Sequence, residues 1–183
     1  MSPDGRRAKG ALRRRALLEA TLRVVGREGV AAVSQRAVAA EADVPPSAVL
    51  YYFPSVDSLL VTALREVNDR YCAELAAVTS LADLASHVAR WATQDRDRVI
   101  AEYELWLLAA RRADLRDELR RWDDAVDALA ARLAPERAEV LAAALNGLYL
   151  RAATVGTTHT DAARVFDAVV VTSPSSKLGK SGH

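Results

Sequence analysis

The side chains that most often perform catalysis or hold metal ions are few in this chain and lie far apart. Its three histidines and single cysteine do not have the spacing of metal ligands, and Asp123-Asp124 lies in a charged helical stretch whose simplest interpretation is a solvated face. No phosphate-binding loop, nucleophile elbow or dinucleotide fingerprint occurs in the sequence. We therefore expect a protein that is not an enzyme and that has no metal site and no cofactor.

Residues suited to recognition gather instead in one stretch, 34–53, which reads SQRAVAAEADVPPSAVLYYF. Ser34 stands where a helix N-cap accepts a backbone N–H, and residues 35–42 favour a short helix. Pro45 and Pro46 end that helix, because the residue before a proline is driven out of the αR region, and Pro46 can begin the next one. Two short helices with about three residues between them predict a helix-turn-helix, whose second helix enters the DNA major groove.

The residue types of this motif divide into packing and contact positions. We expect Val49, Leu50 and Phe53 to pack in the core. Tyrosine hydroxyls commonly bind phosphates, and small side chains allow close approach to a thymine methyl group. Because the second helix has no Arg, Lys, Asn or Gln, guanine readout would fall to Gln35 or Arg36. The predicted DNA-binding residues are Ser34, Gln35, Arg36, Pro45, Pro46, Ser47, Ala48, Tyr51 and Tyr52.

These residues resemble the DNA-binding end of TetR-family transcriptional regulators, and the match runs from Arg13 to Leu64. Ser34 occupies the position of the family's Thr/Ser cap, and Ala42-Asp43-Val44 that of its Ala-Gly-Val turn. Leu50-Tyr51-Tyr52-Phe53 falls where the family closes its recognition helix. The resemblance implies an N-terminal three-helix domain with the helix-turn-helix, followed by a helical bundle for ligand binding and dimerisation. It also implies a repressor that a small-molecule effector releases from a double-stranded DNA operator.

The sequence departs from the family pattern at three positions. Asp43 replaces the turn glycine, and we expect the turn to survive with some strain. Pro45 replaces the usual serine cap, which removes a side-chain acceptor worth roughly 0.5–2 kcal/mol. Val56 stands where a lysine often reaches a DNA phosphate, so we expect that contact to be lost.

Charge is distributed unevenly along the chain. Residues 1–56 carry nine Lys and Arg against five Asp and Glu, whereas the remaining 127 residues carry 16 against 19. The positive end of the molecule therefore coincides with the helix-turn-helix, as a phosphate-binding face requires. The basic segment at the N-terminus could equally extend this face or serve as a solubilising tail.

The composition predicts an all-α protein. The chain is 51% hydrophobic with few glycines, and it contains no alternating β-branched run. Helices are predicted over 13–28, 57–78, 81–94, 95–112, 114–134 and 139–155, with a last helix capped by Thr160 or Asp161 and continuing through Val170. We divide the chain into a flexible basic arm (1–10), a DNA-binding domain (11–70), an effector-binding and dimerisation domain (71–172) and a disordered tail (173–183).

Aromatic and amphipathic side chains are distributed over four of these predicted helices. A bundle can bring them together around a mostly apolar space with a few polar atoms, which is what a small-molecule pocket requires. Each of them taken singly could simply fill the core. The resemblance favours the pocket and implies an apolar or aromatic effector. The predicted ligand-binding residues are Tyr71, Trp91, Tyr103, Trp106, Leu107, Asn146 and Tyr149.

A homodimer is expected from the last two helices. The helix over 139–155 is apolar on two sides, and such a helix needs two partners, of which one can be a second subunit. A single helix-turn-helix also binds weakly, and a two-fold dimer would read two half-sites. The predicted interface residues are Val140, Ala143, Ala162, Val165, Phe166 and Val169.

Three sequence features bear on compartment and on alternatives. A single cysteine suits a reducing cytoplasm, the basic N-terminus lacks the apolar region of a signal peptide, and no apolar stretch approaches 18 residues, so no membrane span is expected. One alternative function is an activator that uses the same motif, or a protein that binds DNA without a ligand. Another is a helical ligand-binding or dimerisation module without operator binding, which Pro45 and Val56 would favour.

Overall fold

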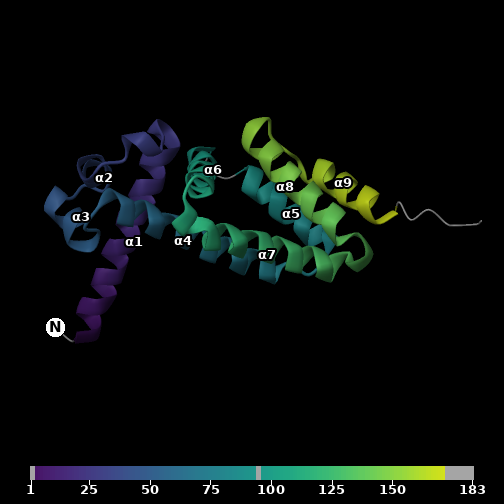
Figure 1. Ribbon diagram of the computed structural model, residues 1–183, viewed down its shortest axis with the longest axis horizontal. Helices are drawn as coiled ribbons and strands as arrows, with labels where there is room; N and C mark the ends of the chain where they lie inside the picture. The colour runs from purple at the N-terminus through teal and green to yellow at the C-terminus, as the bar shows by residue number, and fades with distance from the viewer. Residues whose placement is uncertain (1–2, 94–95, 172–183) are drawn as a thin grey trace, which may run out of the picture.

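The computed structural model describes residues 3–93 and 96–171, and Figure 1 displays their arrangement. In chain order the elements are α1 (Pro3–Glu28), η1 (Val30–Ala32), α2 (Gln35–Glu41), α3 (Pro46–Tyr52), α4 (Val56–Ala77), α5 (Leu81–Ala92), α6 (Arg96–Ala110), η2 (Ala113–Leu115), α7 (Arg116–Leu133), η3 (Pro135–Arg137), α8 (Ala138–Thr154) and α9 (His159–Val171), where η marks a short 3-10 helix. Within these residues there is no β-strand, and the predicted all-α class is confirmed.

The N-terminal unit packs α1, η1, α2, α3 and the first half of α4 around one hydrophobic core. Leu17 from α1, Val38 from α2 and Val49 from α3 have no exposed surface. Apolar residues recur at helical spacing, so each helix buries one stripe and leaves its opposite face to solvent. The predicted three-helix arrangement ahead of a longer fourth helix is therefore confirmed.

The C-terminal unit packs α5, α7, α8 and α9 around a second core, at the other end of the molecule in Figure 1. Leu84 from α5, Leu129 from α7 and Phe166 from α9 are at most 1% exposed. α9 packs against α5 and α8, so its apolar face is covered within the same chain.

Two helices belong to both units. α4 contributes Leu59 to the N-terminal core and Leu75 to the C-terminal core, so the boundary predicted at residue 70 falls inside a continuous helix. α6 packs against α1 so closely that a Cβ atom at Gly26 would overlap the backbone of Asp97. Gly26 therefore permits this helix crossing, and α6 touches the DNA-binding unit along α1.

The structure corrects two predicted boundaries. The segment 1–10, predicted as a flexible arm, is helical from Pro3, because α1 continues towards the N-terminus through residues that do not interrupt it. α9 begins at His159, and its cap is Thr158, whose hydroxyl accepts the backbone N–H of Asp161 at 3.1 Å. The predicted caps at Thr160 or Asp161 are therefore wrong by a few residues. The tail predicted over 173–183 lies outside the described residues.

Individually, the described helices lack the features of a membrane span, and together they lack those of a metal site. No single helix is long and apolar enough to cross a bilayer, and only the bent pair of α3 and α4 meets the criteria of length and composition together. In the part of the chain that the structure describes, no group of three His, Cys, Asp or Glu side chains lies close enough to hold a metal ion.

Candidate functional site

The helix-turn-helix is built from local backbone chemistry. Ser34 has an extended backbone, and its hydroxyl accepts the N–H of Ala37 at 3.0 Å, as predicted for the cap. The turn passes through Asp43, whose φ of 51° lies in the left-handed region that a glycine would enter at lower cost. Pro45 precedes α3 and makes no side-chain cap hydrogen bond. Both predicted departures in the turn are therefore confirmed.

Ion pairs hold the angle between α1 and α2. Arg23 Nε and Arg27 Nη2 donate to the two oxygens of Glu41, at 2.5 Å and 2.6 Å. Hydrogen bonds from Arg27 and Arg23 lower the pKa of Glu41 to about 2. A carboxylate that receives two guanidinium groups fixes orientation better than a single surface pair does.

The recognition helix α3 buries one edge and exposes the rest. Val49 and Phe53 are 0% and 2% exposed, which confirms them as packing residues. Leu50, also expected to pack, is 52% exposed, because it follows Val49 by one residue and therefore points about 100° away from the buried stripe. Tyr51 is 81% exposed and is the most prominent side chain on the outer face.

The nine predicted DNA-binding residues differ in accessibility. Gln35 is partly engaged, since its Nε2 donates to the carbonyl of Phe53 at 3.4 Å and ties α2 to the end of α3. Tyr52 is half-buried, with its hydroxyl beside Gly10 of α1. The exposed members are Ser34, Arg36, Pro45, Pro46, Ser47 and Tyr51, and the half-buried ones are Gln35, Ala48 and Tyr52. Of the two candidate base readers, Arg36 is the one with the free surface.

A basic stripe lies on α1 next to this motif. Arg7, Lys9, Arg13 and Arg14 are exposed, and the guanidinium of Arg14 lies 5.2 Å from the centre of the Phe53 ring. Figure 1 shows the N-terminal half of α1 projecting beyond α2 and α3. The stripe thus extends the positive surface past the recognition helix.

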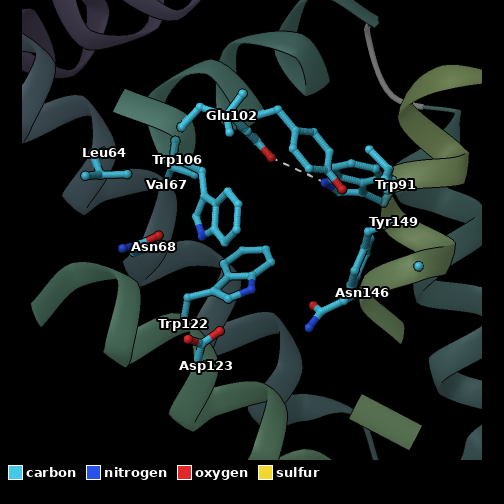
Figure 2. Close-up of a pocket in the computed structure, with 14 residues that line it drawn as sticks. Leu64, Val67, Asn68, Trp91, Glu102, Trp106, Trp122, Asp123, Asn146 and Tyr149 are labelled. Atoms are coloured by element: carbon cyan, nitrogen blue, oxygen red, sulfur yellow. Dashed lines mark hydrogen bonds between the residues drawn. The ribbon is translucent and has the colours of Figure 1, made fainter. Parts of the chain in front are cut away.

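A cavity of about 640 Å³ lies at the junction of the two cores (Figure 2). α4, α5, α6, α7 and α8 all contribute to its wall. The lining residues are Leu64, Val67, Asn68, Trp91, Glu102, Tyr103, Trp106, Leu107, Trp122, Asp123, Asn146, Gly147, Tyr149 and Leu150. A volume of this size is within the range typical of small-molecule sites.

Six of the seven predicted ligand-binding residues surround this one cavity. They are Trp91, Tyr103, Trp106, Leu107, Asn146 and Tyr149. Tyr71 does not line it, because the indole of Trp122 stacks on its ring with 3.5 Å between centres and covers it. Tyr71 therefore supports the wall from behind.

Sequence reasoning missed several residues of the wall. Trp122 lines the cavity but is not among the predicted ligand-binding residues. Asp123, interpreted as solvated, has exposed surface but also lines the cavity. Burial, followed by repulsion from Asp127 and Asp124, raises the pKa of Asp123. Glu102 carried no motif signal, and only the tertiary structure places it here.

Glu102 is the most buried charged group in the cavity wall, with 9% of its surface exposed. It accepts the indole N–H of Trp91 at 3.3 Å, drawn as a dashed line in Figure 2. It also accepts hydrogen bonds from Arg70 and, at 3.4 Å, from Arg98. Burial raises the pKa of Glu102, and the guanidinium group of Arg70 and the hydrogen bond from Trp91 oppose this shift.

The cavity also contains an uncommitted donor. Trp106 Nε1 is buried and makes no hydrogen bond with any residue that the structure describes. Buried polar atoms of this kind are rare in native structures, and this donor is free to bind an acceptor on a ligand or a water molecule in the cavity. The wall therefore combines five aromatic rings, two carboxylates and a free N–H.

The predicted dimer interface divides into two groups. Ala162, Phe166 and Val169 are buried in the C-terminal core, so their assignment to an intersubunit surface is wrong. Helical periodicity identified the apolar face of α9 correctly, but α5 and α8 of the same chain cover it. Val140 and Val165 are 47% and 37% exposed, and Ala143 is exposed as well.

Comparisons with known proteins agree with both units. Residues 17–63 match the family model described as bacterial regulatory proteins, tetR family, and residues 76–172 match that of the tetracyclin repressor-like C-terminal domain. HTH-type transcriptional regulator BetI of Rhizobium meliloti (strain 1021) is 29% identical over 114 residues, which cover 60% of this chain and 56% of BetI.

Solved structures extend the likeness over most of the chain. A TetR-family member from Streptomyces coelicolor A3 is 36% identical with a TM-score of 0.73, covering 86% of this chain and 98% of that one. The multidrug binding protein EbrR complexed with malachite green is 37% identical with a TM-score of 0.68, covering 86% and 97%. With a matching family model over each unit, the chain belongs to the TetR family of DNA-binding transcriptional regulators.

Proposed function

We propose that this regulator is a repressor that an aromatic cation releases from its operator. The observation that carries the proposal is the cavity wall, in which Glu102 and Asp123 are the charged groups and Trp91, Tyr103, Trp106, Trp122 and Tyr149 are the rings. Aromatic faces and carboxylates both attract cations, and an apolar wall favours a flat hydrophobic body. This narrows the apolar or aromatic effector expected from sequence to a positively charged one.

A related protein supports this ligand class. EbrR has been solved in complex with ethidium, malachite green and proflavin, and it is 37–38% identical to this chain in those three comparisons. These names describe what EbrR binds. They make aromatic cations the first class to test on this chain.

The DNA-binding role rests on α3 and its surroundings. Tyr51 and Ser47 form the exposed face of the recognition helix, and Arg36 reaches out from α2. Tyr51 would bind a phosphate, and Arg36 would supply the base contact that α3 lacks. We assign the α1 stripe, with Arg7, Lys9, Arg13 and Arg14, to flanking phosphates, which would strengthen binding without adding sequence preference.

We further propose a homodimer through the outer faces of α8 and α9. Val140 on α8 and Val165 on α9 are each more than a third exposed there. Two recognition helices related by a two-fold axis would read half-sites one helical turn or a multiple apart. The interface thus excludes the inward residues of α9 that the sequence had suggested.

DNA binding distinguishes one functional alternative, and the direction of the effect on transcription distinguishes the other. A ligand-binding module without operator binding would match the absent cap at Pro45 and the absent lysine at Val56. The intact cap at Ser34, the intact turn and the exposed face of α3 argue against this alternative. An activator would bind the same DNA but raise transcription. The proposal includes no enzymatic activity, and a regulator of transcription would act in the cytoplasm beside the chromosome.

The ligand class is tested with two probes of one shape. Biphenyl-4-carboxamidine is a cation at neutral pH, and biphenyl-4-carboxamide is its neutral counterpart. We expect calorimetry to give at least tenfold tighter binding of the amidine, because only the amidine can pair with Glu102. Equal affinities for the two probes, or binding of neither, would contradict the proposed class. A Tyr103→Ala variant should bind the amidine more weakly and bind DNA with unchanged affinity.

A further inference from the structure

The two carboxylate oxygens of Glu102 have different partners. Oε2 accepts the N–H of Trp91 and belongs to the cavity side, where Figure 2 shows it pointing towards the Trp91 indole. Oε1 receives Arg70 from α4 and Arg98 from its own helix α6, the latter at 3.4 Å. One buried charge is therefore shared between the ligand cavity and a pair of cations outside it.

These two cations lead directly to the DNA-binding unit. Arg98 Nη1 donates to Glu19 of α1 at 3.1 Å. Arg70 lies on α4, whose first residue, Val56, comes four positions after the end of α3 at Tyr52. Because a helix transmits displacement along its axis, the position of Arg70 relative to Glu102 bears on where α4 and the recognition helix stand.

We propose that Arg70 is a resident counter-ion that a cationic effector displaces from Glu102, and that this displacement loosens α4 from α6 and weakens operator binding. The inference rests on the proposed function in one respect, namely that the effector is a cation. It adds the residue that senses the charge and the contact that the charge breaks.

The electrostatics favour displacement over simple addition. Glu102 is only 9% exposed, and its carboxylate already pairs with the guanidinium groups of Arg70 and Arg98. A third cation beside Oε2 would repel Arg70 and Arg98 at short range in a medium that screens poorly. Arg70 can leave at low cost, since its side chain is 35% exposed and Glu74 on the next turn of α4, 3.6 Å away, can receive it. Arg98 is less free, because it is held by Glu19 and is 28% exposed.

The scheme makes Arg70 a switch between two states of one equilibrium. With Arg70 on Glu102 the protein binds DNA, and with Arg70 released it binds the cation. A ligand shifts such an equilibrium only through its preference for one state, and the coupling is reciprocal. A variant that removes Arg70 should therefore move the two affinities in opposite directions.

The test is Arg70→Gln in the full chain, measured at pH 8 so that Glu102 stays ionised. We expect operator affinity without ligand to fall at least fivefold, the lower end of typical allosteric coupling. We expect affinity for biphenyl-4-carboxamidine to rise by a similar factor, because its competitor is gone. The amidine should then have little further effect on DNA binding.

Arg65→Gln is the matched control. Arg65 lies on the same helix and pairs with Glu118 of α7 at 3.0 Å rather than with Glu102. It removes the same charge from α4, so a general loss of positive charge would affect both variants alike. We expect Arg65→Gln to change neither affinity by more than twofold.

A second variant, Glu102→Gln, cuts the same contact from the other side. Its amide oxygen can still accept from Trp91, but the charge is lost. Operator affinity and amidine affinity should both fall, in contrast to Arg70→Gln. Arg70→Gln changing both affinities in the same direction, or neither, would overturn the switch. Failure of the wild-type protein to bind the amidine would instead overturn the proposed ligand class, and the operator affinity of Arg70→Gln would still test the contact between α4 and α6.

Discussion

The two units of this protein satisfy their buried polar groups differently. In the N-terminal unit the buried hydroxyl of Thr21 donates to the carbonyl of Leu17 at 2.8 Å, and the helix starts at Ser34 and Ser55 carry side-chain caps. Within residues 3–93 and 96–171, the buried side-chain atoms without a hydrogen bond lie outside α1, α2 and α3, and they include Trp106 Nε1 on α6 and His87 Nε2 on α5. We call the N-terminal unit closed, because the buried polar side chains of α1, α2 and α3 are hydrogen-bonded. We call the C-terminal unit open, because buried polar atoms without a hydrogen bond lie in it and in the helices that join it to the N-terminal unit.

This difference matches what each unit does. A DNA reader benefits from a rigid core, because its contact residues must hold one geometry on the duplex. A ligand-binding unit must accept a foreign molecule, and unpaired donors beside a cavity provide its hydrogen bonds. The helices α4 and α6, which serve both cores, are where the closed unit meets the open one.

The largest expected effect comes from removing one buried phenyl ring in each core. Phe53 and Phe166 are 2% and 0% exposed, in the N-terminal and C-terminal cores respectively. Each Phe→Ala change should cost about 3–5 kcal/mol of unfolding free energy. Because α4 and α6 join the cores, we expect the whole protein to unfold in one thermal transition, followed by circular dichroism. Both variants should lower the midpoint temperature of that transition. Two transitions, each moved by only one variant, would instead divide the molecule into independent units.

The next largest effect concerns the DNA-binding face alone. Tyr51→Phe removes a single hydroxyl from a side chain that is 81% exposed. If that hydroxyl binds a phosphate, operator affinity should fall by about 1.5–3 kcal/mol, as for hydrogen bonds to charged groups. The thermal transition should not move. Unchanged affinity in a gel shift would place the phosphate contact on another residue.

A pH-dependent effect is expected from the C-terminal unit. Burial lowers the pKa of His87 to about 4, below the ordinary value of 6.5. Between these values the unfolded chain binds more protons at His87 than the folded chain does. The contribution of His87 to the free energy of unfolding is therefore fully present above pH 6.5 and declines as the pH falls towards 4. The decline should approach about 1.4 kcal/mol per pH unit at most. A His87→Leu variant should have a flatter profile in denaturant titrations, and a parallel one would contradict this origin.

The smallest effect per residue concerns the α1 stripe. Replacing Arg7, Lys9 and Arg13 by Gln should leave sequence preference unchanged but reduce the dependence of affinity on salt. Each lost phosphate contact lowers the slope of log K against log salt concentration by about 0.9. Exposed Arg116 and Arg120 on α7, changed to Gln, provide the control. An unaltered slope would make the stripe a solvated helix end.

The closed unit could be predicted from sequence much better than the open one. Ser34, Asp43 and Pro45 act on backbone atoms a few residues away, so their effects are encoded locally and were predicted correctly. The start of α1 was missed because the composition of residues 1–10 suggested a flexible arm. No residue between Pro3 and Arg13 stops the helix, so it continues to Pro3. Leu50 was misplaced because an apolar residue beside a buried stripe need not belong to it.

The open unit depends on contacts between distant residues. The aromatic positions indicated a pocket, but which ring faces it was decided by stacking, with Trp122 in front of Tyr71. Glu102 had no sequence signal, because its role comes from Arg70 and Trp91 on other helices. For α9, periodicity identified an apolar face but could not tell whether the same chain or a partner covers it.

The most direct test of the account is the affinity of the wild-type protein for its operator with and without the cation. The operator can be selected from a random duplex pool, and affinity measured by fluorescence anisotropy at saturating biphenyl-4-carboxamidine, with the carboxamide as control. We predict that the amidine weakens operator binding roughly 5- to 150-fold, which is the usual range of allosteric coupling, and that the carboxamide does not. The same dissociation constant in all three titrations, with the amidine bound in the cavity, would contradict the coupling of ligand to DNA.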